Sequence, residues 1–354
     1  MASTKPLVLV IGGTGVQGIP VVKQLIEDGA YNIRLITRRA NSQYAQELAQ
    51  LPSVTVIEGD IYSESDLHKA FSGCTHAFIN TNGGAIGEKS EMYWGIRYFE
   101  IARTHKLKHF LYSSLEYSLK ISDFDNNYRD GHMDAKAKVA DWISVQDKKK
   151  MKWSVLTSCL YMEMLNEMLA PHPDKEDPEV LAFSAPLGPR GSAPLIALED
   201  FGKYARWAFD HPERSNGLNL HVASQEVIWA DIPAAFTEVT GKKAVYRDVT
   251  LQSWFDLGIF PDPDAKFGHS APDNEGTLQT YRENFGGFWN FWKSGKVRKD
   301  WVLMDEILPG RIRTLKEWMK KSGYDGNIKA LLHDYHGPER SFRKGMRFDN
   351  ASQS

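Results

Sequence analysis

Three glycines follow an apolar run at a spacing of three, in the stretch LVLVIGGTGVQGIPVV. Gly12, Gly15 and Gly18 form the pattern G-x-x-G-x-x-G, and an amphipathic, helix-like segment comes next. A strand, a glycine turn and a helix in this order suit a pyrophosphate, because glycine lets the anion approach the backbone and the helix N-terminus offers free N–H groups. The alternative is a purely structural tight turn. We predict a dinucleotide site built from Gly12, Thr14, Gly15, Val16, Gln17 and Gly18.

Two arginines end the next apolar run, where dinucleotide-binding proteins often carry an acidic residue. An acid at this place accepts hydrogen bonds from the ribose of NAD, whereas a guanidinium suits the 2′-phosphate of NADP. Arg38 and Arg39 directly follow Thr37, and Arg38 comes first after the run. We therefore predict NADP(H) as the cofactor and Arg38 as its main selector. Two merely solvated arginines are the alternative.

Polar residues also end the third and fourth apolar runs. Asp60 precedes Ile61, and this pair suits the amino group and the ring of an adenine. Asn80, Thr81 and Asn82 close the following run. Because the carboxyl ends of parallel strands border the crevice where a cofactor passes, we assign all five residues to the cofactor site. Simple strand caps are the alternative.

These residues need a scaffold of alternating strands and helices. Apolar, β-branched runs predict strands at 7–11, 33–37, 54–60, 76–82, 109–114 and 153–158, with amphipathic helices between them. The alternation is typical of a doubly wound parallel α/β sheet, the Rossmann fold, and the looser pattern after Tyr161 predicts a smaller mixed α/β C-terminal subdomain. We expect a Rossmann domain over 1–158, completed by about 190–222, a substrate subdomain over 159–189 and 223–335, and a basic polar tail over 338–354.

Composition limits the partners. Lysine and arginine total 43 against 45 aspartate and glutamate, so no basic excess favours nucleic acid as a direct partner. Cys74 and Cys159 are far apart, as free thiols of a reducing compartment would be, and no cysteine or histidine spacing matches a metal site. No stretch approaches the roughly 20 apolar residues of a membrane helix, and MASTKP leaves no room for a signal peptide. We expect a cytoplasmic or nuclear protein that binds a small molecule and no membrane.

Taken together, these motifs resemble the NmrA-like family, an atypical branch of the short-chain dehydrogenase/reductase superfamily. The resemblance covers residues 7 to about 250 and includes GGTGVQG, TRR, EGD, YSSLE (112–116), HMDAKAKVADW (132–142), CLYMEML (159–165), ALEDFGKYA (197–205) and FTEVTG (236–241). It implies a Rossmann domain, a smaller C-terminal subdomain and a nicotinamide cofactor between them. Some members of this family are NADP-sensing regulators without catalysis, and isoflavone-reductase-like relatives are NADPH-dependent reductases.

The resemblance also points to an acid–base helix. Superfamily members carry Tyr-x-x-x-Lys with a serine nearby, and the similar stretch here has His132 at the tyrosine position and Lys136 at the lysine position. Both can transfer a proton, and Lys136 can instead hold the nicotinamide ribose. By the same resemblance Ser113 or Ser114 lies beside the nicotinamide, and Tyr161 contacts cofactor or substrate. The alternatives are a packing histidine, strand-end caps and a core tyrosine.

The segment 285–301 contains six aromatic residues: Phe285, Phe288, Trp289, Phe291, Trp292 and Trp301. Those at 285, 288, 289 and 292 share a helical spacing. Such a helix can wall a site for a ring-bearing substrate, form the subdomain core or face a partner. The preceding segment 257–274 is rich in proline, glycine and aspartate, and we consider it a possible lid.

These observations predict an NADPH-dependent reductase that acts on a small cyclic or aromatic carbonyl or conjugated substrate. Two alternatives stay open. One is a non-catalytic NADP(H)-sensing regulator with a protein partner. The other is a redox-neutral isomerase or cyclase that keeps the cofactor site. A homo-oligomer is compatible with each of these functions.

Overall fold

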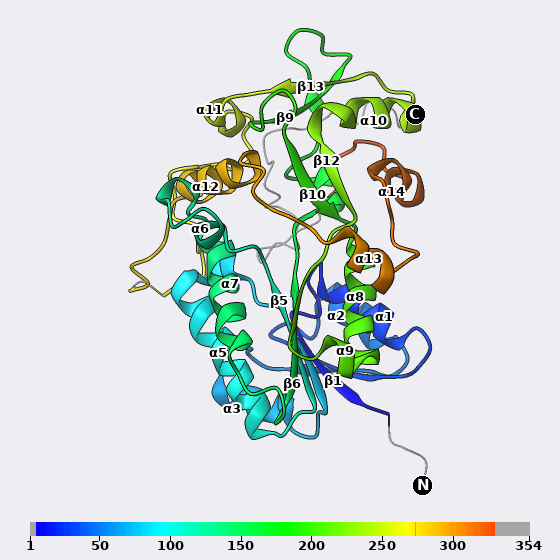
Figure 1. Cartoon of the computed structure of the whole chain (residues 1–354), viewed down its shortest axis with the longest axis vertical. Coiled ribbons are helices and arrows are strands. Elements are labelled where there is room, and N and C mark those ends of the chain that lie inside the picture. The colour runs from blue at the N-terminus through cyan, green and yellow to red at the C-terminus, as the bar shows by residue number, and fades with distance from the viewer. Residues whose placement is uncertain (1–4, 273, 330–354) are drawn as a thin grey trace.

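A seven-stranded sheet forms the lower half of the molecule in the computed structural model, which describes residues 5–272 and 274–329 (Figure 1). Its strand order is β11-β6-β5-β4-β1-β2-β3, and every neighbouring pair is parallel. The strands are β1 (Leu7–Ile11), β2 (Asn32–Thr37), β3 (Val54–Glu58), β4 (His76–Ile79), β5 (His109–Ser114), β6 (Lys152–Thr157) and β11 (Leu218–His221). From β1 the chain first adds β2 and β3 on one side and then crosses to add β4, β5 and β6 on the other side. The crevice of a doubly wound fold lies at this change, between β1 and β4.

Helices cover both faces of this sheet, because the parallel strands are buried on both sides. One face carries α1 (Gly18–Ile26), α2 (Gln43–Ala49), α8 (Leu198–Asp210) and α9 (Pro212–Ser215); the other carries α3 (Glu64–Phe71), α5 (Glu88–Thr104) and α7 (Gly131–Ser144). Short turns link them at α4 (Gly83–Ile86), α6 (Ser118–Ile121) and the 3-10 helix η1 (Asn126–Tyr128). The predicted Rossmann fold is confirmed.

The upper half of the molecule holds two small mixed sheets. One joins β12 (Gln225–Ile228), β10 (Ser192–Ile196) and β7 (Leu160–Tyr161); the other joins β13 (Ala244–Asp248), β9 (Leu181–Ala185) and β8 (His172–Pro173). Each sheet contains one parallel and one antiparallel pair. Helical elements surround them: η2 (Met162–Asn166), η3 (Trp229–Asp231), α10 (Ile232–Thr240), α11 (Leu251–Phe255), α12 (Tyr281–Lys293), α13 (Trp301–Ile307) and α14 (Leu315–Ser322). The predicted smaller mixed α/β part is therefore present.

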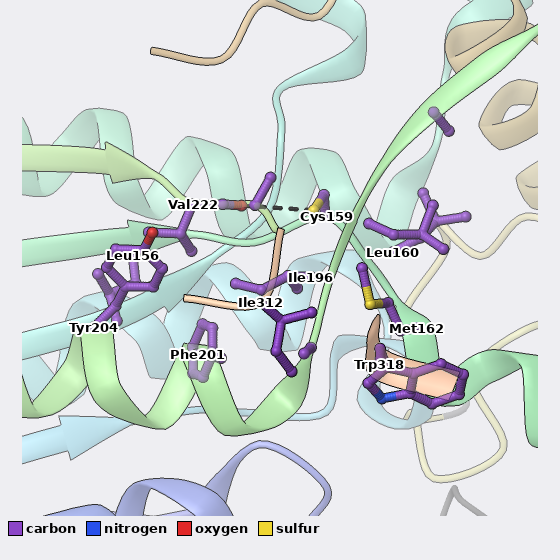
Figure 2. Close-up of a cluster of buried hydrophobic side chains, with 14 of the residues drawn as sticks. Leu156, Cys159, Leu160, Met162, Ile196, Phe201, Tyr204, Val222, Ile312 and Trp318 are labelled. Atoms are coloured by element: carbon purple, nitrogen blue, oxygen red, sulfur yellow. Dashed lines mark hydrogen bonds between the residues drawn. The ribbon is translucent and has the colours of Figure 1, made fainter. Parts of the chain in front are cut away.

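One apolar core continues from the face of the large sheet into the small sheets. Phe201 of α8, Met162 after β7 and Trp318 of α14 belong to it, as Figure 2 shows. Burial of these large side chains stabilises the packing between the two halves. The domain boundaries at 158, 189 and 222 stay a prediction, and the predicted tail over 338–354 lies outside the described residues.

The aromatic segment forms α12, as its spacing predicted. A capping box between Thr280 and Glu283 starts the helix. Trp289 packs edge-on against Trp229 and Trp254, with ring centroids 6.2 and 5.2 Å apart. The helix is thus mainly part of the subdomain core.

The described residues test two other expectations from the sequence. Cys74 and Cys159 are both free and buried. Over 5–272 and 274–329, no helix combines the length and apolarity needed to cross a bilayer.

Candidate functional site

The glycine turn joins β1 to α1 at the crevice. Gly12 has a φ of +77°, and a Cβ atom there would lie 2.2 Å from the carbonyl oxygen of Asn80. A Cβ atom on Gly18 would lie 2.1 Å from the carbonyl oxygen of Gly12. Only glycine fits at either position, so the turn stays compact and touches the loop after β4. At Gly15 a Cβ atom would meet a single atom within 4 Å, the carbonyl oxygen of Gly12 at 3.2 Å, so protein does not crowd this part of the turn.

Gln17 connects the glycine turn to two other elements. Its Oε1 accepts a hydrogen bond of 2.6 Å from Ser113 at the end of β5, and its Nε2 donates one of 2.6 Å to the Tyr161 hydroxyl of β7. Gln17 is 2% exposed, and burial raises the pKa of Tyr161 well above the usual range of a phenol. The Ser113 hydroxyl donates its hydrogen bond to Gln17, whereas the Tyr161 hydroxyl accepts a hydrogen bond from Gln17. The Tyr161 hydroxyl therefore keeps its own proton, which Ser158 beside it or a further acceptor can receive. Thr14 and Val16 are half-buried at the same turn.

Lys136 of α7 reaches the end of β4. Its Nζ lies 2.9 Å from Glu91 Oε1, 3.1 Å from Thr81 Oγ1 and 3.4 Å from Asn80 Oδ1. Lys136 is 7% exposed, and Glu91 of α5 is fully buried. The structure thus joins Lys136 to two predicted cofactor residues. Sequence reasoning missed Glu91, although its position on the apolar stripe of α5, one turn before the buried Gly95, is a usable signal.

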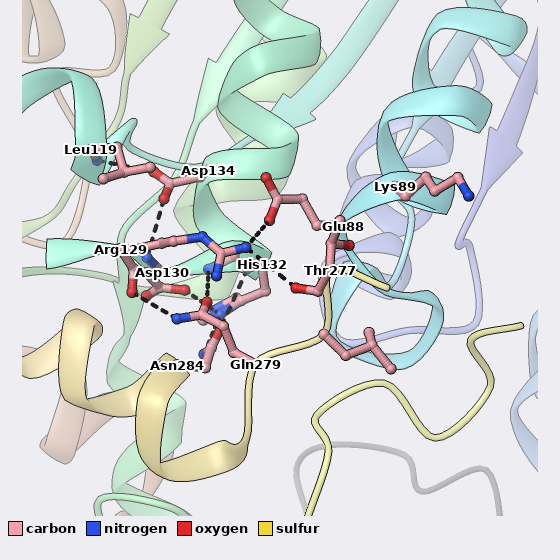
Figure 3. A network of polar contacts seen from close by, with 12 residues as sticks. Glu88, Lys89, Leu119, Arg129, Asp130, His132, Asp134, Thr277, Gln279 and Asn284 are labelled. Atoms are coloured by element: carbon pink, nitrogen blue, oxygen red, sulfur yellow. Dashed lines mark hydrogen bonds and ion pairs between the residues drawn. The ribbon is translucent and has the colours of Figure 1, made fainter. Parts of the chain in front are cut away.

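His132 lies one turn before Lys136 but has different surroundings (Figure 3). Its Nδ1 is 2.5 Å from Asp130 Oδ1 and 2.9 Å from Asn284 Nδ2. Burial acts to lower the pKa of His132, but Asp130 and Asn284 outweigh it and raise the pKa above the usual value. The ring packs within 5.6–6.4 Å of three phenylalanine rings: Phe267, Phe285 and Phe288. Its contacts are those of a packing residue between α7 and α12.

The segment before α12 is tied to the rest of the site. The Phe267 N–H donates to Gln279 at 2.9 Å, and the Ser270 N–H donates to Ala85 of α4 at 2.8 Å. A Cβ atom on Gly84 would lie 2.6 Å from the Phe267 ring. Through Phe267 and Ser270, this segment therefore packs against α4.

The remaining predicted residues divide between the crevice and local caps. Arg38 and Arg39 are exposed beyond the end of β2. The loop that holds Asp60 lies beside them, because the Gly59 N–H donates to Thr37 at 3.0 Å. Asp60 Oδ1 accepts from the Tyr62 N–H at 3.0 Å, which closes a local turn. The carbonyl of Ile61, beside it, accepts from Tyr98 at 2.8 Å.

Ser114 and Asn82 have contacts of a simpler kind. Ser114 Oγ donates to the Leu115 carbonyl at 3.2 Å, and strand alternation places it on the face of β5 opposite Ser113. Asn82 is exposed at the N-terminus of α4. Of the two serines, Ser113 is the one that the structure links to the glycine turn.

A second buried charge cluster lies at the other end of the sheet edge, and sequence reasoning missed it. Glu116 accepts from Lys299 at 2.8 Å, and both its oxygens lie 3.0 Å from His221 Nδ1. Burial acts to raise the pKa of Glu116, but Lys299 and His221 outweigh it and lower the pKa to about 2. The cluster borders a cavity of about 420 Å³ whose lining includes Tyr204 and Leu220. It fastens the segment between α12 and α13 to the sheet.

Comparison with known proteins agrees with this geometry. The sequence model of the NmrA-like family matches residues 4–271. This chain belongs to the NmrA-like family. One member, the NmrA-like family domain-containing oxidoreductase malD of Malbranchea aurantiaca, is 25% identical over 345 residues, which is 91% of this chain and 98% of malD. The NmrA-like resemblance inferred from the motifs is confirmed.

Two solved structures share the fold of this NmrA-like chain. NmrA, a negative transcriptional regulator in complex with NADP, has a TM-score of 0.68 at 16% identity, over 90% of this chain and 95% of NmrA. The NADPH-dependent quinone oxidoreductase QOR2 of Escherichia coli, complexed with NADPH, has a TM-score of 0.67 at 17% identity, over 89% of this chain and 99% of QOR2. The NmrA-like fold therefore occurs in both a regulator and an oxidoreductase.

Proposed function

We propose that this NmrA-like protein is an NADPH-dependent reductase of a small cyclic or aromatic carbonyl or conjugated substrate. The observation that carries the proposal is the placement of Lys136 and the Ser113–Gln17–Tyr161 chain at the ends of neighbouring strands, beside the glycine turn. A cation and an oriented hydroxyl at this edge are what a bound nicotinamide and a substrate carbonyl require.

The residues present fit a dinucleotide. The compact turn from Gly12 to Gly18 leaves backbone room for a pyrophosphate at the start of α1. Arg38, supported by Arg39, would pair with a 2′-phosphate, and Asp60 with Ile61 would hold the adenine. Asn80, Thr81 and Asn82 would border the nicotinamide half. NmrA and QOR2, which share the fold, are described with NADP and NADPH.

The residues beside the nicotinamide would have different roles in binding and in proton transfer. When bound, NADPH supplies the hydride. Lys136 would hold the ribose hydroxyls, and Gln17 would orient Ser113 and Tyr161. The Tyr161 hydroxyl would donate a hydrogen bond to the substrate carbonyl, and Phe285 and Phe288 of α12 would offer apolar surface to its ring. We also propose catalytic roles for Ser114 and His132 and a ring-bearing substrate. Turnover measurements on variants of both residues test these roles.

A cofactor-sensing regulator is the second candidate, and one observation favours it. His132 stands where the resemblance places a catalytic tyrosine, and its Nδ1 contacts Asp130 and Asn284 within the protein. A histidine held in this way presents no free donor at that atom. NmrA, a negative transcriptional regulator, shares the fold.

Calorimetry and NADPH oxidation separate these proposals. We expect the purified protein to bind NADPH more tightly than NADH, and to oxidise NADPH with at least one member of a panel of quinones and cyclic ketones. Lys136→Ala should raise the KM for NADPH tenfold or more, because a donor to the ribose is lost. Binding without turnover across the panel would favour the regulator. Absence of binding to both dinucleotides would overturn both candidates.

A further inference from the structure

Glu91 is the buried partner of Lys136, and its contacts converge on one oxygen. Glu91 Oε1 accepts from Lys136 at 2.9 Å, from the Thr81 hydroxyl and from the Tyr112 hydroxyl at 3.4 Å. Glu91 Oε2 is buried and has no hydrogen-bond partner within the part of the chain that the structure describes. Three donors therefore converge on one carboxylate oxygen, and the bond from Lys136 ties α7 to α5 at this point.

Lys136 complements this carboxylate atom by atom. An ammonium has three N–H donors, and Lys136 Nζ has three acceptors: Glu91 Oε1, Thr81 Oγ1 and Asn80 Oδ1. Thr81 donates to Glu91 and accepts from Lys136, so the hydroxyl has a fixed direction. A neutral amine has only two donors and would leave one acceptor unmatched.

The two helices hold the pair in place. Gly95 lies one turn after Glu91 on α5, and a Cβ atom there would come within 2.7 Å of Val139 on α7. The missing side chain therefore lets α5 and α7 approach closely enough for Lys136 to reach Glu91. The Tyr112 ring of β5 lies 5.8 Å from Lys136 Nζ and favours a cation.

We propose that Glu91 is a positioning residue that keeps Lys136 as a permanent ammonium aimed at the end of β4. Lys136 then serves as a fixed donor to ribose hydroxyls and does not itself supply or take the proton of the reaction. The weakest of its three bonds, 3.4 Å to Asn80, is the one that a ribose hydroxyl can replace. This use of the ammonium depends on the proposed function, whereas its charge does not.

The electrostatic reason is the cost of separating the pair. If Lys136 lost its proton, Glu91 would be a buried carboxylate without a cation beside it, and an unpaired buried charge costs much free energy. The other titratable groups facing the pair are Tyr112 of β5 and Tyr98 of α5. Burial raises the pKa of both phenols well above the usual value, so neither offers a competing charge.

Competitive acetylation with isotopic acetic anhydride tests the charge without any cofactor. The pH midpoint of Lys136 labelling, read by peptide mass spectrometry, should be no lower than that of the exposed Lys149 in the wild-type protein. In Glu91→Gln it should fall by about one pH unit or more, because the opposite charge is lost. Glu91→Asp, which keeps the charge, should recover part of this shift.

Glu88→Gln is the matched control. Glu88 lies on the same helix as Glu91. It pairs with Lys138 of α7 and with Arg129 just before α7, and both cations are more exposed than Lys136. Figure 3 shows the pair of Glu88 and Arg129. Its loss should leave the Lys136 midpoint unchanged. A wild-type midpoint below that of Lys149, or equal midpoints in wild type and Glu91→Gln, would overturn the proposal. The wild-type measurement by itself tests the charge of Lys136. If Glu91→Gln does not fold, a Glu91→Asp midpoint equal to that of wild type would overturn the role of Glu91.

Calorimetry then connects the charge to binding. We expect NADPH affinity to fall about tenfold in Glu91→Gln and to stay within twofold in Glu88→Gln. If the wild-type protein binds no dinucleotide, the proposed function fails while the labelling result still stands. If it binds NADPH and Glu91→Gln binds equally well, the positioning role fails alone.

Discussion

Two buried lysine–glutamate pairs lie at the carboxyl edge of the same sheet and differ in how completely they are satisfied. In the pair of Lys299 and Glu116 the side chains are 1% and 2% exposed, and His221 reaches both carboxylate oxygens. In the pair of Lys136 and Glu91 the side chains are 9% and 0% exposed, and one carboxylate oxygen is unpartnered among the described residues. Buried polar atoms are normally satisfied, so an exception calls for an explanation.

The difference indicates two roles. The pair of Lys299 and Glu116 is a structural fastening between two parts of the chain, whereas the pair of Lys136 and Glu91 belongs to the candidate site. Glu116 anchors the segment before α13, and its polar atoms are used up inside the protein. Lys136 faces polar side chains at the end of β4, where a ligand can replace a weak contact. Equal burial therefore does not mean an equal role.

Removing the cation of the fastening should have the largest effect. We expect Lys299→Met to lower the free energy of unfolding by about 3 kcal/mol, because Glu116 loses its buried cation and keeps only the contact with the partly exposed His221. Urea denaturation followed by tryptophan fluorescence measures this. Lys296→Met, an exposed change in the same segment, should cost less than about 1 kcal/mol. A similar small loss in Lys299→Met would remove the distinction between the two pairs.

Removing the cation of the site should act on binding. We expect Lys136→Met to weaken NADPH binding tenfold to a hundredfold, about 1.4–2.7 kcal/mol, since a charge-assisted donor to the ribose is lost. Lys138→Met, on the same helix but paired with Glu88, is the control for calorimetry. Equal affinities in these two variants would contradict the assignment of Lys136.

Acid should weaken the fastening. The pKa of Glu116 is lowered to about 2 from an ordinary 4.5, so its contribution to stability is present above pH 4.5 and is lost as the pH falls toward 2. Between about pH 5 and about pH 3, wild type should lose about 1–2 kcal/mol more than Glu116→Gln. Parallel losses in chemical denaturation at the two pH values would show that Glu116 is not the titrating group.

Gln17 gives the smallest and most local test. Gln17→Leu leaves Ser113 and Tyr161 without their shared partner, and we expect kcat to fall about tenfold, near 1.4 kcal/mol, with little change in NADPH affinity. Gln17→Glu accepts from both hydroxyls and draws the Tyr161 proton inward, so its turnover should be no higher than that of Gln17→Leu. Restored turnover in Gln17→Glu would contradict the direction of the hydrogen-bond chain.

Much of the fold follows from local pattern. The alternation of apolar runs and amphipathic segments predicts the first six strands of the large sheet, because each side-chain period matches one kind of element. The third and fourth runs were wrong at their ends: β3 stops at Glu58 and β4 at Ile79, and the pattern did not predict the short helix α4 that follows β4. Asn80, Thr81 and Asn82 therefore follow the strand, where their side chains are not committed to the sheet.

The sequence predicts which residues belong to the site better than it predicts the hydrogen bonds between them. Gln17, Ser113 and Tyr161 each appear as candidates from sequence, yet only the fold reveals that one amide bridges all three. His132 and Lys136 share a helical spacing, but one packs against α12 and the other against α5. Spacing within one helix says nothing about which distant element each residue meets.

Local chemistry was enough to determine the nature of the turn, the class of the sheet and the sign of the charges after β2, because glycine geometry, side-chain period and residue charge are properties of neighbouring residues. Tertiary structure alone decided that Glu91 neutralises Lys136 and that Lys299 neutralises Glu116. These partners are 45 and 183 residues apart, and the burial that makes their charges interact strongly exists only after the sheet and its helices have packed.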